Sequence, residues 1–217
     1  MRAFAARTAP FPVAANKPKE VGKLMLAIEH FVGTPVVRAA LQLAPLTFVR
    51  PGELRNARWA EINLDDSEWR IAAERMKSRQ PHIVPLAAKA VHILRDLQPL
   101  TGDSEYVFPS HRSAGRPMSD NAVLVALRAL GFPKEMMTGH GFRAMARTIL
   151  DEVLEYRVDL IEHQLAHAVR DPNGRAYNRT AHLAERKKMM QGWADYLDQL
   201  RQEASDTVVV PQKHAKA

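Results

Sequence analysis

The side chains best suited to chemistry in this chain are cations and imidazoles that bind phosphate groups. Arg50 comes directly before Pro51, a residue that suits the first position of a helix. A guanidinium at a helix start, with free backbone N–H groups behind it, is well placed to hold a phosphate. His140 and Arg143 are three residues apart, so a helix starting there would let both reach one phosphate. Each of these residues taken alone is also a common surface residue of a basic protein.

Two more residues stand out by their neighbours in the sequence. Lys77 falls in the polar segment 77–80, which we expect to form the tight turn of a hairpin, where a lysine can project into a groove. A solvated turn residue is the plain alternative. Tyr177 lies in a basic polar stretch rather than in an apolar stripe, so we expect it to be exposed among cations. The remaining tyrosines fit structural positions; these are Tyr106, Tyr156 and Tyr196.

Metal-dependent and nucleotide-dependent chemistry finds little support in the motifs. His163 and His167 are four residues apart with Glu162 beside them, but no third ligand follows at a recognisable zinc spacing. The sequence has no Gly-rich phosphate loop and no Gly-x-Ser-x-Gly motif, which argues against nucleotide hydrolysis and esterase chemistry. It has no cysteine, which excludes a thiol nucleophile and any cysteine-bound metal. We therefore predict no metal site.

The charge balance points to a polyanionic partner. The 217 residues include 31 Lys and Arg against 24 Asp and Glu, a formal net charge of +7. Such a surplus favours nucleic acid first and a membrane surface second. No apolar run approaches the ~20 residues that a membrane-spanning helix needs, and the N-terminus lacks the apolar core of a signal peptide. We therefore expect a cytoplasmic protein with no membrane partner.

The elements that must position these residues are mainly helices, with one small antiparallel β-sheet. Apolar periodicity, with capping and breaking residues, predicts a short helix after Arg50 and longer ones over 21–31, 36–46, 87–97, 122–130, 142–154, 159–167 and 181–200. Segments 68–73 and 82–86 fit the two strands of a hairpin, the second at a sheet edge because of Pro85. We expect a linker or truncated lead-in over 1–19, one α+β domain over 20–201 and a polar tail over 202–217.

As an ordered set, the candidate residues make the chain resemble the catalytic domain of tyrosine recombinases, and in particular the integrases of prophages and genomic islands. The set is Arg50, Lys77, His140, Arg143, His167 and Tyr177, with Tyr177 ten positions after His167. The strings that carry the likeness are LTFVRPGEL, MKSRQPHIVPL, MTGHGFRA, IEHQLAH and AYNR, followed by MMQGWADYLD near the C-terminus. The likeness covers about residues 18–201, nearly the whole expected domain.

The resemblance implies site-specific DNA recombination, in which Tyr177 cleaves one strand and becomes joined to it by a 3′-phosphotyrosine bond. Arg50 and Arg143 would clamp the non-bridging phosphate oxygens, which gain negative charge in the transition state. His140 is a candidate base for the tyrosine proton, since a phenol attacks well only when its proton is accepted. Lys77 would be the proton donor to the leaving 5′-oxygen.

Two further roles follow from the same resemblance. His167 would hydrogen-bond the scissile phosphate, and Glu53 would orient nearby cationic or imidazole groups rather than react. The protein supplies the cations, and the covalent intermediate keeps the bond energy for religation, so no metal, ATP or other cofactor is implied.

Integrases of this type normally carry an arm-site-binding domain and a core-binding domain before the catalytic one, and neither fits in residues 1–19. We therefore expect an isolated catalytic domain whose partner is double-stranded DNA at attachment sites. The resemblance also implies self-association on DNA as a tetrameric synapse, and location at the bacterial nucleoid when bound to DNA. Two alternatives stay open: a type IB-like topoisomerase, which rejoins the original strand, and a non-catalytic DNA-binding remnant.

Overall fold

Proline residues mark where the first three helices begin. In the computed structural model, which describes residues 17–167 and 182–208, a proline opens α1 (Pro18–Glu29), α2 (Pro35–Thr47) and α3 (Pro51–Arg55). Proline suits this position because no intrahelical bond needs its missing N–H. Thr34 also caps α2, because its hydroxyl accepts a hydrogen bond from the backbone N–H of Val37 at 3.4 Å. The three expected helices are confirmed, with the short one starting directly after Arg50.

The expected hairpin belongs to a three-stranded antiparallel sheet in the order β1-β2-β3. Its strands are β1 (Ile62–Asn63), β2 (Glu68–Ile71) and β3 (His82–Pro85), so Pro85 does lie on an edge strand. The connection is longer than the predicted turn at 77–80, since it covers residues 72–81 and contains a 3₁₀ turn before the hydrogen-bonded turn in which the N–H of Arg79 donates to the carbonyl of Met76 at 3.0 Å. The longer path lets the side chain of Met76, which is 3% exposed, reach the core between two exposed stretches.

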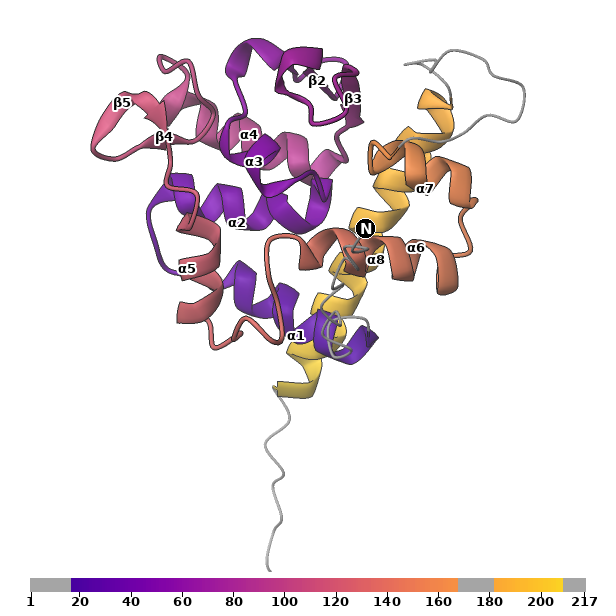
Figure 1. Cartoon of the computed structure of the whole chain (residues 1–217). Helices are drawn as coiled ribbons and strands as arrows, with labels where there is room; N and C mark the ends of the chain where they lie inside the picture. The colour runs from indigo at the N-terminus through magenta and orange to yellow at the C-terminus, as the bar shows by residue number, and fades with distance from the viewer. Residues whose placement is uncertain (1–16, 168–181, 209–217) are drawn as a thin grey trace, which may run out of the picture.

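The sequence pattern does not predict a second, two-stranded ribbon. It consists of β4 (Pro109–Ser110) and β5 (Ser113–Pro117) and follows the predicted helix α4 (Ala88–Thr101). Both strands are short and polar, so no alternation of apolar residues marks them. Figure 1 shows this ribbon projecting from the body on the side away from α7 and α8.

The remaining helices follow the predicted ones with shifted ends. They are α5 (Ala122–Ala129), α6 (Gly141–Glu152), α7 (Val158–Gln164) and α8 (Leu183–Val208). α7 ends before its predicted end at residue 167, because Ala166 has left-handed backbone with φ 50°. α8 continues past residue 201 to Val208, so the first part of the expected tail is helical. The domain boundaries themselves stay a prediction.

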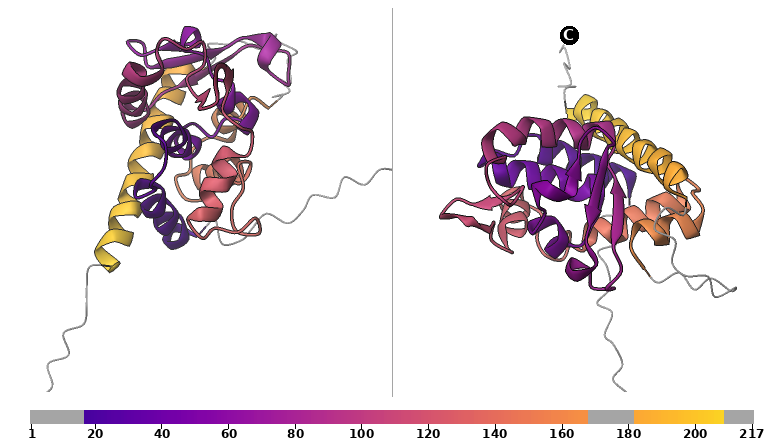
Figure 2. Two further views of the ribbon diagram at one scale, coloured as in Figure 1. Left: turned by 90° about the vertical axis from the view of Figure 1, so that its left-hand side faces the viewer. Right: turned by 90° about the horizontal axis from the view of Figure 1, so that it is seen from above.

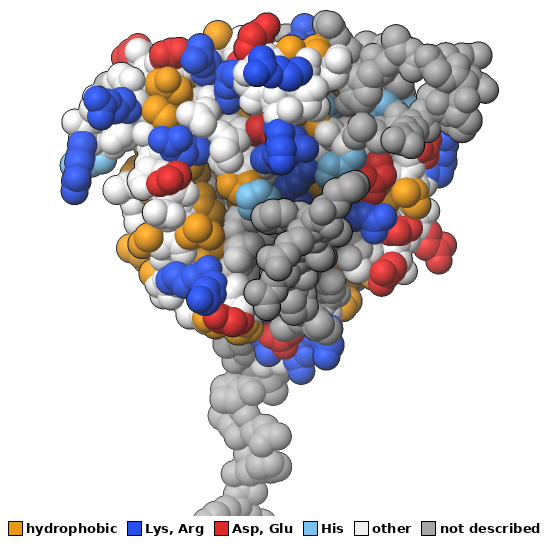
Figure 3. All heavy atoms as spheres, viewed as in Figure 1, with side chains coloured by type: hydrophobic (Ala, Val, Ile, Leu, Met, Phe, Trp, Pro, Cys, Tyr) orange, Lys and Arg blue, Asp and Glu red, His pale blue; other side chains and the backbone are white. Residues whose placement is uncertain are grey.

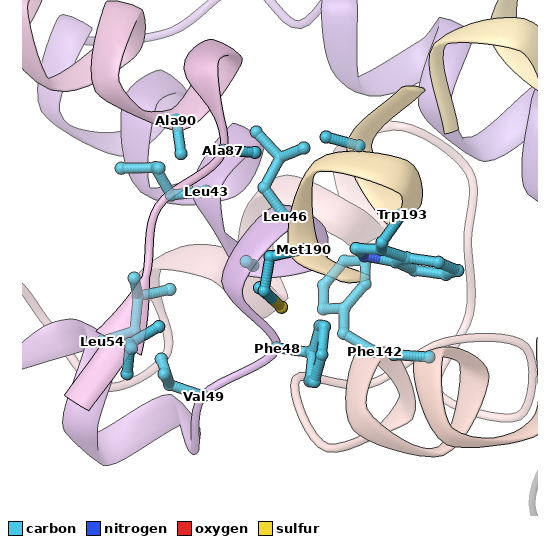
Figure 4. Close-up of a cluster of buried hydrophobic side chains, with 14 of the residues drawn as sticks. Leu43, Leu46, Phe48, Val49, Leu54, Ala87, Ala90, Phe142, Met190 and Trp193 are labelled. Carbon is cyan, nitrogen blue, oxygen red and sulfur yellow. The ribbon is translucent and has the colours of Figure 1, made fainter. Parts of the chain in front are cut away.

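Buried aromatic side chains tie the elements that carry the candidate site to α8 (Figure 4). Phe48, between α2 and α3, meets Trp193 of α8 edge-on with ring centroids 6.1 Å apart. The indole N–H of Trp193 donates a hydrogen bond to the carbonyl of Pro45 at 2.8 Å. Phe142, in the first turn of α6, belongs to the same buried cluster. The residues on either side of Arg50 and Arg143 are therefore fixed by core packing.

The first and last helices of the described chain also pack against each other, as Figure 2 shows. A Cβ atom at Gly22 of α1 would lie 2.4 Å from the carbonyl oxygen of Leu200 in α8, so the close approach requires glycine. Glu29 of α1 forms an ion pair with Arg201 at 2.8 Å. Within the described ranges, no helix is both long and apolar enough to cross a membrane.

Candidate active site

Two helix starts and one helix end converge on the candidate site. A Cβ atom at Gly139 would lie 2.8 Å from Cγ of Pro51, so the turn before α6 packs directly on the first residue of α3. This contact brings His140, the residue before α6, next to Arg50, the residue before α3. The C-terminal end of α7 borders the site with its backbone carbonyl groups.

Arg50 is held by a carboxylate three residues further along the chain. Its backbone N–H donates to Oε2 of Glu53 at 2.9 Å, and its Nη1 donates to Oε1 at 2.8 Å. Glu53 is only 6% exposed. The carboxylate therefore caps the helix and aims the guanidinium at the same time, which agrees with the orienting role expected for Glu53.

Arg143 is buried, and no carboxylate among the described residues forms an ion pair with it. Its Nη1 donates to the carbonyl of Phe48 at 2.8 Å and its Nη2 to the carbonyl of Leu165 at 2.6 Å. Burial, and then the positive charge of Arg50, lower the pKa of Arg143 to about 10, so it stays charged at neutral pH. Two guanidinium groups thus lie close together beside one carboxylate, an arrangement that favours an incoming anion.

Three consecutive backbone carbonyls at the end of α7 lie within hydrogen-bonding distance of His82, Arg143 and Arg50. The carbonyl of Gln164 accepts from Nε2 of the buried His82 at 3.1 Å, that of Leu165 accepts from Arg143, and that of Ala166 lies 3.5 Å from Nη2 of Arg50. Carbonyls at a helix C-terminus carry partial negative charge and have no intrahelical partner. They compensate the buried cations while leaving the positive charge of the arginines available to a ligand.

His140 lies at the mouth of the site. Partial burial, followed by the charges of Arg143 and Arg50, lowers the pKa of this imidazole, and Lys77 acts in the same direction. A neutral imidazole can accept a proton, as a general base must. The effect of Lys77 on His140 also shows that the predicted lysine lies near the other site residues.

Lys77 is exposed on the 72–81 connection, next to the buried Met76. In the part of the chain that the structure describes, its ammonium group has no hydrogen-bond or ion-pair partner. The amine is therefore presented to the surface. Figure 3 shows blue and pale-blue side chains gathered near the middle of this face, close to the place of α3 in Figure 1.

His167 joins the arginine pair from the end of α7. Its Nε2 lies 3.4 Å from Nη2 of Arg143, and its Nδ1 lies 2.5 Å from Oε2 of Glu162. The structure thus brings together five of the six predicted site residues. The sixth, Tyr177, lies outside the described residues.

The other tyrosines are accounted for by contacts elsewhere. Tyr106 pairs by backbone with Arg58 and lies under its guanidinium, 5.8 Å from the ring centre. A Cβ atom at Gly192 would lie 2.4 Å from the hydroxyl oxygen of Tyr156, so this hydroxyl packs directly against α8. Burial and the charge of Glu203 raise the pKa of Tyr196. These contacts agree with the structural positions predicted for them.

The sequence interpretation did not identify His82 as part of the site. Burial, and then the charge of Arg186, lower the pKa of His82 to about 3, so it is neutral. It stands in a strand with apolar neighbours, where a histidine signals packing rather than chemistry. His82 does lie in MKSRQPHIVPL, one of the strings that carry the family resemblance, and this is the signal that could have pointed to it.

The comparisons with known proteins agree with this arrangement. Residues 17–183 match the model of a family described as the phage integrase family. The integrase of Enterobacteria phage P4 is 43% identical over an alignment of 202 residues, and the match covers 87% of this chain and 46% of that protein. The prophage integrase IntZ of Escherichia coli strain K12 is 41% identical over 181 residues, covering 83% and 44% of the two chains. The chain spans about half the length of the curated relatives it matches.

A solved structure shows the same fold at low sequence identity. An integrase from mycobacterium phage Brujita matches with a TM-score of 0.63 and 12% identity, over 92% of this chain and 66% of that chain. The likeness confirms the predicted fold class, mainly helical with a small antiparallel sheet.

Proposed function

This chain belongs to the phage integrase family, and from that premise we propose that it cleaves and rejoins DNA strands in site-specific recombination of a prophage or genomic island. The observation that carries the proposal is the pair of guanidinium groups, Arg50 and Arg143, held side by side by Glu53 and backbone carbonyls. A phosphodiester gains negative charge on its non-bridging oxygens in the transition state, and preorganised cations stabilise that charge. Membership of the family favours this function over a topoisomerase or a DNA-binding remnant.

The proposed reaction needs one nucleophile and two proton transfers. The phenol oxygen of Tyr177 attacks the phosphorus while His140 accepts its proton, and the bond from phosphorus to the 5′-oxygen breaks. Lys77 gives the leaving oxygen a proton, which yields a free 5′-hydroxyl and a 3′-phosphotyrosine. Rejoining is the reverse reaction with a 5′-hydroxyl of a second strand. The neutral state favoured at His140 and the exposed, unpaired amine of Lys77 suit these roles.

We propose that the DNA duplex lies across the face that carries the arginine pair and extends toward the β4–β5 ribbon. Arg112 and Arg116 on this ribbon are exposed, and their side chains make no ion pair within the described ranges. Arg157, on the other side of the molecule, is by contrast paired with Asp159 and Glu185. Figure 3 shows blue side chains over the ribbon and again near the middle of the same face. Cations without an acidic partner are the ones available to phosphates.

The family resemblance also implies self-association. We propose that protomers assemble on attachment-site DNA as a tetrameric synapse, in which two duplexes exchange strands.

A DNA substrate with a nick just downstream of the cleavage position tests the proposed chemistry. The short 5′-hydroxyl product diffuses away, so a covalent protein–DNA adduct accumulates and survives denaturant. The wild-type chain should form this adduct, and Tyr177→Phe should abolish it while DNA binding stays nearly intact. Tyr106→Phe is the matched control and should form adduct normally.

Two results would overturn the assignment. Adduct formation by Tyr177→Phe, or attachment of the DNA to another tyrosine, would remove Tyr177 from its role. DNA binding without any adduct in the wild-type chain would instead indicate a non-catalytic DNA-binding module.

A further inference from the structure

Glu162 is held between two basic side chains at the edge of the site. Its Oε2 lies 2.5 Å from Nδ1 of His167, and its Oε1 accepts a hydrogen bond from Nε of Arg147 at 2.9 Å. Arg147 stands one helical turn after Arg143 on α6, while Glu162 and His167 come from α7 and the residues that follow it. Both carboxylate oxygens are therefore engaged, and the carboxylate has a fixed orientation.

This contact decides which nitrogen of the imidazole faces the arginine pair. A carboxylate at Nδ1 requires a proton on that nitrogen, so Nε2 is left to point toward Nη2 of Arg143, 3.4 Å away. In the absence of DNA, Nε2 accepts from the guanidinium. The ring is thereby held with Nε2 on the side where a phosphate bound by the arginine pair would lie.

Several charged groups surround His167 besides Glu162. Arg143 faces it from α6, Arg147 of the same helix donates to its partner Glu162, and Arg50 approaches the carbonyl of the preceding residue, Ala166. All three are positive. Glu162 is the carboxylate in direct contact with the imidazole. Burial alone would raise the pKa of Glu162, but the hydrogen bonds from His167 and Arg147 lower it overall, so the group is ionised at neutral pH.

We propose that Glu162 is a positioning residue for strand cleavage, acting through His167: its charged hydrogen bond to Nδ1 fixes the ring with Nε2 toward the scissile phosphate. The inference rests on the proposed function, since it assigns His167 to the phosphate. A purely structural ion pair between Glu162 and Arg147 is the competing explanation.

A kinetic double-mutant cycle separates the two explanations. Single-turnover cleavage of the nicked substrate is measured for the wild type, Glu162→Gln, His167→Gln and the double variant. Glu162→Gln keeps the shape of the side chain but removes its charge, and it should slow cleavage roughly tenfold or more, as loss of a group that supports a ligating histidine does. In the His167→Gln background the same change should slow cleavage less than about twofold, because its target is gone.

Asp151→Asn is the matched control. Asp151 also approaches Arg147, at 3.9 Å from Nη1, but the contact belongs to the other side of that guanidinium and does not involve His167. This variant should cleave within about twofold of the wild type, the usual scale for an exposed pair. Dissociation constants for DNA should stay unchanged in both variants, so that the loss appears in the cleavage rate. Glu162→Asp, which draws the carboxylate back by one methylene, should show part of the loss.

Equal slowing by Glu162→Gln in both backgrounds would overturn the inference, as would wild-type rates in Glu162→Gln and Glu162→Asp. Slowing by Asp151→Asn to the same extent would also overturn it in favour of the structural ion pair. Circular dichroism of each variant shows whether it is folded. If Glu162→Gln does not fold, Glu162→Asp replaces it in the double-mutant cycle. Failure of the proposed function gives a different result, because the wild type itself would then form no adduct.

Discussion

The two sides of the candidate site are built in different ways. At the junction of α3, α6 and α7, Arg50 and Arg143 are held by Glu53 and by carbonyls of the backbone. On the 72–81 connection, Lys77 is exposed, whereas the neighbouring Met76 is buried and Arg75 forms an ion pair with Glu61. The arginines are part of the fold, whereas the lysine is carried on a surface segment.

The difference follows from what each group must do. A clamp for a transition state is most effective when its donors are already oriented, because no reorganisation is then needed during the reaction. A proton donor must instead reach an oxygen whose position depends on the bound DNA. In the proposed mechanism, the core therefore fixes the two arginines that stabilise charge, and a surface segment carries the lysine that would give the proton.

Replacing Arg143 with lysine should disrupt the arginine pair and should give the largest loss of cleavage rate and stability. Lysine keeps the charge but cannot donate to the carbonyls of Phe48 and Leu165 together. We expect cleavage to slow by about two orders of magnitude or more. The free energy of unfolding should fall by about 1–3 kcal/mol, the cost of leaving a buried acceptor unsatisfied. Adduct formation and chemical denaturation measure the two effects.

Lys77→Ala should separate cleavage from stability. The variant should also cleave more slowly, but the free energy of unfolding of this variant should stay within about 0.5 kcal/mol of the wild type, because the Lys77 side chain is exposed. Equal destabilisation by the two substitutions would show that the two sides of the site are not built differently.

The buried His82 gives a smaller effect that depends on pH. Its folded pKa of about 3 lies well below the ordinary value near 6.5, so as pH falls the unfolded chain takes up a proton that the folded chain refuses. Stability is therefore lost as pH falls below about 6.5, and the lowered pKa values of His140 and His163 act with the same sign. Between pH 6 and 4, the free energy of unfolding of His82→Gln should fall less steeply than that of the wild type, by roughly 1 kcal/mol per pH unit.

Denaturation curves at several pH values measure that slope. The slope is independent of any constant destabilisation by the substitution itself, and parallel pH dependence in variant and wild type would contradict the prediction.

The smallest effects are expected at the β4–β5 ribbon. Arg112→Ala and Arg116→Ala should each weaken DNA binding a few-fold and reduce the salt dependence of log K by about 0.9 if one phosphate contact is lost. Neither should change cleavage at saturating DNA or the stability of the fold. Titrations at two salt concentrations check this, with Arg157→Ala as a control at a paired arginine. An unchanged salt slope in both ribbon variants would remove the ribbon from the DNA surface.

Much of this architecture could be predicted because its signals are local. Prolines mark the helix starts, and the types and order of the site residues are visible in the sequence. The carbonyls that hold Arg143 could not be predicted, because every residue has a carbonyl and only the fold selects those of Phe48 and Leu165.

The missed and shifted elements have equally physical causes. β1 has two residues and β4 has two, too few to show a period. The polar end of α8 lacks an apolar stripe, but it is supported by hydrogen bonds between side chains four residues apart, Gln199 to Glu203 and Gln202 to Asp206. Such pairs are compatible with a helix without requiring one, so the sequence pattern ended the helix too early.

The packing of α1 on α8 sets the order in which the chain can fold during synthesis. Gly22 can meet the backbone of Leu200 only after almost all of the domain has been translated. At ~5–20 residues per second, α1 leaves the ribosome on the order of ten seconds or more before its partner helix exists. Its apolar side, which includes Val21, Leu24 and Ile28, is unprotected by α8 during that interval. α8, which is made after the other elements of the described fold, therefore completes the burial of α1.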